Sequence, residues 1–224
     1  MAAPKFAWSY SVLDMYETCP KKYYHIKVVK DAKDEDSSFA HEGKQIHEAL
    51  YHRVVHGTSL PLPLRHLEKV AAPYALIPGD KYGELQFALD KQLSPVAWFD
   101  KAAWVRAIID LVIVNGNKAL LIDWKTGKPK EGFDQLKLSA AILSRQMPEI
   151  EKFTCAYVWV NHSDTKPYQF TMEKKHMKAV WADNYEKVKE IEDALKTTTF
   201  PASESPLCRW CPVRTCPHNK KEAK

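Results

Sequence analysis

Apolar residues recur along this chain at spacings that predict an alternation of helices and strands. Helical spacing predicts helices at 9–18, 38–56, 133–145 and 173–195. Strand patterns cover 82–99, 104–127, 153–160 and 167–171. Residues 61–78 are interrupted by prolines and are expected to form a connector with one short helix. This order predicts an α/β fold with a central mixed β-sheet flanked by helices.

The segment 104–127 carries the most specific pattern. Two apolar runs are joined by Asn115-Gly116, which is the strongest short-range signal for a β-hairpin. Each run contains one aspartate, Asp110 in the first and Asp123 in the second. A carboxylate in a buried strand is costly unless it is paired or binds a metal.

Lys125 follows Asp123 by two positions, so both side chains leave the strand on the same face. This pattern favours a divalent cation held by carboxylates beside an ammonium group. The alternative is that the two aspartates only flank strand ends. Glu84 is expected to open a strand ahead of the hairpin and to be solvated there, the alternative being a second-metal or water-bridging carboxylate.

The 224 residues predict a single domain, 1–224, in three parts. These are an N-terminal helical part at 9–60, a sheet core at 80–172, and a C-terminal helix with a cysteine tail at 173–224. No apolar run is long enough to span a bilayer and no signal-peptide pattern is visible, which predicts a cytoplasmic protein. The net charge of +5 is compatible with a nucleic-acid partner without establishing one.

The five cysteines are unevenly distributed. Cys208, Cys211 and Cys216 form a C-x2-C-x4-C pattern near the C-terminus, and Cys19 lies near the start. Cys155 lies inside an apolar strand pattern and is expected to be buried. In a reducing compartment such clustering indicates metal ligation rather than disulfides.

Together these motifs resemble the PD-(D/E)XK nuclease superfamily and, within it, the RecB-like branch. The resemblance is carried, in chain order, by residues 9–23, 43–47, Asp110, 122–127 and Gln135-Leu136. The cysteine pattern resembles the iron–sulfur members of that branch, such as the CRISPR-adaptation nucleases and the AddB nuclease domain. The resemblance implies a restriction-endonuclease-like core whose termini are joined by a cysteine-ligated cluster.

The resemblance also implies a role for each site residue. The metal ligands would be His47, Asp110, Asp123 and the backbone carbonyl of Trp124. Lys125 would position or activate the attacking water, and Gln135 would orient the lysine or the substrate. Carboxylate, carbonyl and water ligands favour Mg²⁺ or Mn²⁺, and the imidazole tilts the site toward Mn²⁺.

For the cysteines, the resemblance implies a structural [4Fe–4S] cluster. Its ligands would be Cys19, Cys208, Cys211 and Cys216. The alternative is zinc, bound by the same four residues or with His218 in place of Cys19.

The resulting prediction is a Mg²⁺- or Mn²⁺-dependent deoxyribonuclease that acts on DNA in recombination, repair or adaptation. An exonuclease acting on single strands or DNA ends is favoured over an endonuclease. No phosphate-cradling Gly-rich loop is present, so any unwinding would come from a helicase or recombination partner. The alternative is a catalytically silent nucleic-acid-binding or assembly module of the same fold.

Overall fold

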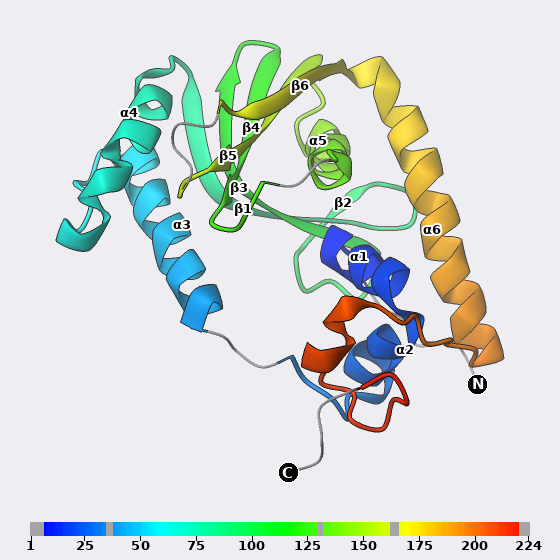
Figure 1. Ribbon diagram of the computed structural model, residues 1–224. Coiled ribbons are helices and arrows are strands. Elements are labelled where there is room, and N and C mark those ends of the chain that lie inside the picture. Colours follow the sequence, from blue (N-terminus) through cyan, green and yellow to red (C-terminus); the bar gives the residue numbers. More distant parts are fainter. Residues whose placement is uncertain (1–6, 35–37, 130–131, 162–165, 220–224) are drawn as a thin grey trace. The chain divides into compact units, whose positions relative to one another are not determined.

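The computed structural model describes residues 7–34, 38–129, 132–161 and 166–219 (Figure 1). The chain divides into two compact units. The first unit combines Met1–Ser37 with Asp183–Lys224, and the second is Ser38–Ala182.

The second unit is built on a six-stranded sheet in the order β2-β1-β3-β4-β5-β6. Its strands are β1 (Asp80–Leu89), β2 (Pro95–Val96), β3 (Val105–Asn115), β4 (Lys118–Lys125), β5 (Lys152–Trp159) and β6 (Tyr168–Glu173). Only the β4–β5 pair is parallel within this sheet, and helix α5 (Asp134–Gln146) forms its crossover. The α/β fold with a mixed sheet flanked by helices is therefore confirmed.

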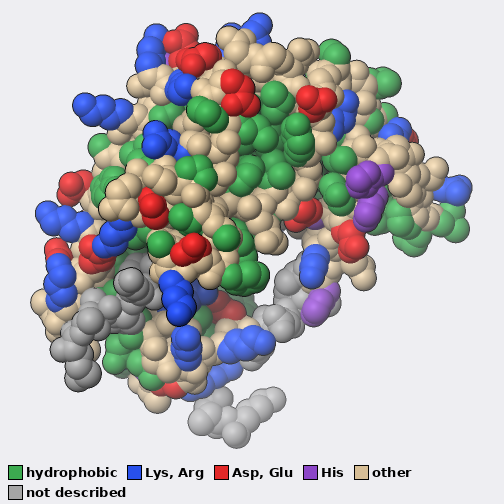
Figure 2. All heavy atoms as spheres, turned by 180° about the vertical axis from the view of Figure 1, so that it is seen from behind, with side chains coloured by type: hydrophobic (Ala, Val, Ile, Leu, Met, Phe, Trp, Pro, Cys, Tyr) green, Lys and Arg blue, Asp and Glu red, His purple; other side chains and the backbone are tan. Residues whose placement is uncertain are grey.

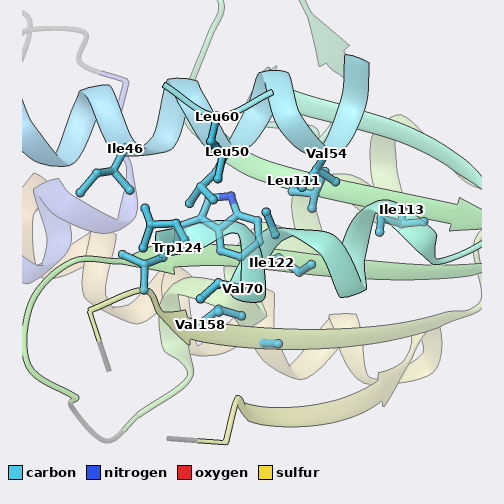
Figure 3. Close-up of a cluster of buried hydrophobic side chains, with 14 residues drawn as sticks. Ile46, Leu50, Val54, Leu60, Val70, Leu111, Ile113, Ile122, Trp124 and Val158 are labelled. Carbon is cyan, nitrogen blue, oxygen red and sulfur yellow. The ribbon is translucent and has the colours of Figure 1, made fainter. Parts of the chain in front are cut away.

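One face of the sheet is covered by α3 (Ser38–His56) and α4 (Glu68–Leu76) (Figure 3). Leu50 of α3 and Leu111 of β3 are both buried in this core, with Trp124 of β4 among them. Tyr74 of α4 meets the Trp124 ring edge to face, with the ring centroids 5.3 Å apart. Burial of these large side chains holds α3 against the sheet.

Helix α5 covers the opposite face. Neighbouring residues of a strand point to opposite sides, so Asp123 lies on the face that Trp124 does not. Gln135 in the first turn of α5 bonds to Asp123, which places this helix over the second face. Most of α5 from Leu136 to Ser144 is buried.

The first unit contains α1 (Tyr10–Thr18), α2 (Pro20–Tyr23), a π-helical turn at Tyr24–Val29 and a 3₁₀ turn at Pro206–Trp210. It also contains most of α6 (Met177–Thr197). Tyr23 is buried between Tyr16 and Phe200, at centroid distances of 5.4 and 6.1 Å. The Lys21 amide donates to the Pro201 carbonyl at 3.1 Å, so the N-terminal helices and the C-terminal tail pack as one unit.

The expected connector with one short helix is confirmed at 61–78, which contains a 3₁₀ turn, Leu62–Leu67, and the short helix α4, which accommodates Pro73. One local expectation was wrong: Glu84 lies in the middle of β1 rather than at its start. Of the helices that the structure describes, none is long and apolar enough to cross a membrane.

Candidate metal-dependent active site

The two central aspartates lie where strands β3 and β4 separate. Pairing between these strands ends at Leu111 and Ile122, although each strand remains paired with its outer neighbour beyond that point. Asp110 and Asp123 are the next residues, so they lie on either side of the gap. The backbone N–H of Trp124 donates to Asp110 Oδ2 at 2.8 Å, which satisfies a donor that the interrupted ladder leaves without a strand partner.

Two further side chains reach Asp110. His47 Nδ1, from α3, lies 3.3 Å from Asp110 Oδ2. The register that pairs Gly83 with Leu111 places Glu84 of β1 directly opposite Asp110. His47, Glu84 and Asp110 each offer one ligand atom within 4.8 Å of the others.

Asp123 belongs to a second set of contacts. Its Oδ2 pairs with Lys125 Nζ at 2.6 Å, and its Oδ1 accepts from Gln135 Nε2 at 2.7 Å. Lys125 Nζ also donates to Gln135 Oε1 at 3.0 Å. The lysine is therefore held between a carboxylate and an amide, with α5 supplying the amide.

The electrostatics of the site favour a bound cation. Burial, followed by repulsion from Asp110, raises the pKa of Asp123 to about 6 despite the adjacent Lys125. Burial and then Asp110 also raise the pKa of Glu84. Burial opposes the charged form of His47, but the surrounding carboxylates outweigh it and raise the pKa of this imidazole. An imidazole beside crowded carboxylates is a donor set that fits a divalent metal.

An open cavity of about 670 Å³ lies beside the site. Its lining residues come from α3, β1 and the segment after β4: Gly43, Lys44, His47, Glu48, Tyr51, His52, Glu84 and Thr126. This volume is in the range of cavities that hold small ligands.

The structure brings together the side chains predicted from the sequence, but in two sets. His47 contacts Asp110, and Asp123 contacts Lys125 and Gln135. Glu84 is exposed, as expected from the sequence, but it also joins the first set, which the sequence interpretation had not favoured. The register of β1 and β3 indicates its role, because two carboxylates directly opposite each other on paired strands repel unless a cation lies between them.

The four motif cysteines lie together in the first unit. They are free thiols that line one cavity of about 290 Å³: Cys19, Cys208, Cys211 and Cys216. Cys19 Sγ accepts from two backbone N–H groups, those of Lys22 and Ser203, each at 3.5 Å. His218 is not among the residues lining this cavity, and its Nδ1 lies 3.3 Å from Glu204.

A mixed sheet that opens around two aspartates, with a lysine two residues after the second, defines an α/β protein with a group of side chains that could hold a metal ion. The sequence pattern of the PD-(D/E)XK nuclease superfamily matches residues 7–217, and the chain belongs to this superfamily.

Other comparisons are more distant. Among solved structures, the one titled "Crystal structure of SSO0001" is 14% identical, and the match covers 93% of this chain and 86% of that chain with a TM-score of 0.45. No curated protein matches the sequence.

Proposed function

We propose that this chain is a metal-dependent DNA nuclease, and specifically an exonuclease that acts on single strands or DNA ends. The observation that carries the proposal is the convergence of Asp110, Asp123 and Lys125 at the gap between β3 and β4, within a chain of a nuclease superfamily. The alternative is a silent binding module of the same fold. It is less well supported, because the acid–acid–lysine set is complete.

The proposed metal ligands are His47, Asp110, Asp123 and the Trp124 carbonyl, with Glu84 beside them. When bound, Mg²⁺ or Mn²⁺ would supply charge neutralisation and a water of lowered pKa for attack on a phosphodiester. Lys125 would hold the attacking water, because its ammonium is fixed at two points by Asp123 and Gln135. Gln135 thereby positions Lys125.

The test is digestion of end-labelled single- and double-stranded DNA by the purified protein with Mg²⁺ or Mn²⁺. Strands labelled at either end would report the polarity of cleavage. Asp123→Asn and Lys125→Ala should each reduce the rate by at least about 100-fold, as expected when a group that acts on the reacting water is lost.

Matched controls are available in the same sheet. Lys118 begins the strand that Lys125 ends, and Asp80 is an exposed acid at the start of β1. Lys118→Ala and Asp80→Asn should retain the wild-type rate. Cleavage retained by Lys125→Ala would refute the assigned site, and DNA binding without hydrolysis in either metal would favour the silent module.

We further propose that the protein belongs to the RecB-like branch and carries a [4Fe–4S] cluster at its four motif cysteines. The shared cavity supports this, as do the two N–H···S bonds to Cys19, a contact that sulfur ligands of such clusters make.

The metal is identified by colour and by elemental analysis of anaerobically purified protein. A brown protein that contains iron and sulfide supports the cluster. A colourless protein containing one zinc ion would overturn it and favour the zinc alternative. Cys155→Ala is the control, because burial raises the pKa of this thiol to about 12 and it should not contribute a ligand.

The proposed cellular context is DNA recombination, repair or adaptation, alongside a helicase or recombination partner. We propose the whole chain, 1–224, as one nuclease domain. On the face seen in Figure 2, basic and acidic side chains are interspersed. On that face DNA would be held by local contacts rather than by a broad basic surface.

A further inference from the structure

A row of aromatic side chains leads away from Lys125. Its ammonium lies 5.0 Å from the centroid of the Tyr157 ring. The Tyr157 ring is parallel to that of Phe133, with an interplanar angle of 4° and centroids 6.1 Å apart. Phe133 in turn stacks on Tyr168 at 4.2 Å and 11°. The three rings thus form a stack that begins next to the lysine of the active site.

The row runs from the buried site to the edge of the sheet. Asp123 is in register with Tyr157, and Tyr157 with Tyr168, so the row crosses three adjacent strands. Tyr157 is 6% exposed, whereas Tyr168 is 41% exposed on the edge strand β6. Phe133 is partly exposed immediately before α5.

Packing alone accounts for only part of this row. Tyr157 is buried and fills the space between the sheet and the start of α5. Tyr168 also meets the Trp159 ring at 6.4 Å, yet its own ring stacks nearly parallel on Phe133 while 41% of the residue stays exposed to solvent. An exposed, ordered aromatic stack next to a phosphodiester-hydrolysing site is suited to stacking with nucleobases.

Only unpaired bases have faces free to stack on protein side chains, because the bases of a duplex are stacked on one another. The charges suit the backbone of such a strand. Lys125 lies at the inner end of the row, Lys128 follows β4, and Lys166 shortly precedes β6. Lys128 and Lys166 are both exposed, and Lys166 precedes Tyr168 by two residues, so its ammonium favours a phosphate backbone passing near that ring.

We propose that Phe133 and Tyr168 form a stacking platform for unpaired bases, so that the site selects single-stranded DNA. The proposal rests on the proposed nuclease function and deepens it by assigning the substrate class to named residues. Stacking on an aromatic side chain tolerates any base, so the platform confers preference for single strands without sequence specificity.

The test compares oligothymidylates that are intact or carry one abasic residue at successive positions. Binding is measured by fluorescence anisotropy in the Asp123→Asn background, which keeps the DNA uncleaved, and cleavage is measured as kcat/KM in the active protein. At one position, the abasic residue should lower both the binding affinity and kcat/KM by about 5- to 150-fold, the range measured for base–aromatic stacking. On intact DNA, Tyr168→Leu should show the same loss of affinity and of kcat/KM. An abasic residue at that position should then have no further effect on the variant.

Two further variants separate stacking from packing. Tyr168→Phe keeps the ring and should behave as wild type. Tyr185 has nearly the same exposure, 40%, but lies on α6 outside the row, so Tyr185→Leu should leave both readouts unchanged. Thermal unfolding of Tyr168→Leu checks that the fold is retained.

The outcomes are distinguishable. The platform is overturned if DNA is hydrolysed but no abasic position changes binding or kcat/KM. It is also overturned if Tyr168→Leu hydrolyses and binds DNA like the wild type. In both cases the nuclease function is retained. Abasic-sensitive binding without hydrolysis in either metal overturns the nuclease function and retains the platform as a single-strand binding surface. If Tyr168→Leu and Tyr168→Phe lose equal amounts of binding and cleavage, the effect comes from the hydroxyl group and stacking by the ring is overturned.

Discussion

Asp123 is the side chain of the candidate site whose burial most clearly opposes folding. It is 8% exposed in a strand between Ile122 and Trp124, both of which are fully buried. Lys125 and Gln135 partly compensate its charge, but burial and Asp110 still raise its pKa to about 6. A carboxylate buried in this way makes the folded protein less stable once it ionises, and a bound cation would offset that cost.

The first prediction concerns the pH dependence of stability without metal. A carboxyl whose pKa is raised from 3.8 to about 6 on folding stabilises the fold below pH 4, and this contribution is lost as the pH rises through 6. Asp123→Asn removes the titration, so in EDTA the variant should gain stability relative to wild type between pH 4 and 7. Each pKa unit corresponds to about 1.4 kcal/mol. Urea unfolding across this range measures the difference.

The control for this prediction is Asp80→Asn, an exposed acid at the start of β1. It should follow the wild-type profile. Parallel stability curves for wild type and Asp123→Asn from pH 4 to 7 would show that Asp123 titrates normally in the folded protein.

The second prediction concerns Glu84, which lies opposite Asp110 and within 4.8 Å of ligand atoms from it and His47. Glu84→Gln removes one negative charge from this group, so Mn²⁺ affinity should fall by at least about tenfold, as for other residues that support a metal. Titration calorimetry measures this. Glu48 lines the same cavity but lies outside the ligand group, so Glu48→Gln is the matched control. Equal affinities of both variants would exclude Glu84 from the metal site.

Helix α3 delivers His47 to the site only because it lies unusually close to strand β1. A Cβ atom built on Gly83 would lie 2.1 Å from Cδ2 of Tyr51, so glycine is required where the α3 side chain crosses this strand. The Tyr51 hydroxyl is hydrogen-bonded to His56 Nε2 at 3.0 Å, which holds the Tyr51 ring in place. The distance between α3 and β1 therefore sets the distance between His47 and Glu84.

The third prediction follows from this contact. Gly83→Ala should lower the free energy of unfolding by about 1–3 kcal/mol, the usual cost of overpacking, and should weaken metal binding as α3 shifts. Adding Tyr51→Ala should restore part of the lost stability. Gly127 has no atom within 4 Å of a built Cβ and no positive φ, so Gly127→Ala should change stability by less than about 0.5 kcal/mol. Denaturant unfolding measures all of these variants.

The two compact units separate the two groups of chemistry-bearing residues. All the acids at the gap between β3 and β4 belong to Ser38–Ala182, and the four motif cysteines belong to the unit made from both ends of the chain. Ligation of a cluster by Cys19 and three C-terminal cysteines would link the folding of α1 and α2 to that of the tail.

The fourth prediction tests this division. If the four cysteines hold the proposed cluster, Cys216→Ala should remove its iron and increase hydrogen exchange in α1, α2 and the C-terminal tail, while the strands of the sheet keep their protection. Cys155→Ala, a change within β5, should leave the iron content unchanged. Uniform loss of protection across the chain in Cys216→Ala would show that the two units unfold together.

Most elements were predictable because their signals are local. The helix expected at 133–145 is found at Asp134–Gln146, and the hairpin turns at Gly116, whose φ is +59°. Ser9 precedes the first helix and is of a residue type that often caps helices, but its side chain makes no capping bond; its hydroxyl lies 3.0 Å from that of Ser11. The capping side chain depends on a rotamer that the sequence does not specify.

The sequence by itself determined the identities of Asp110, Asp123 and Lys125 and their place on adjacent strands, because strand periodicity and the turn are properties of short segments. Only the tertiary structure decided that these strands separate at the aspartates and that Glu84 faces Asp110. It likewise decided that Phe133 stacks on Tyr168 beside the site. Strand register and the packing of α3 and α5 join residues far apart in the chain, and no local pattern contains that information.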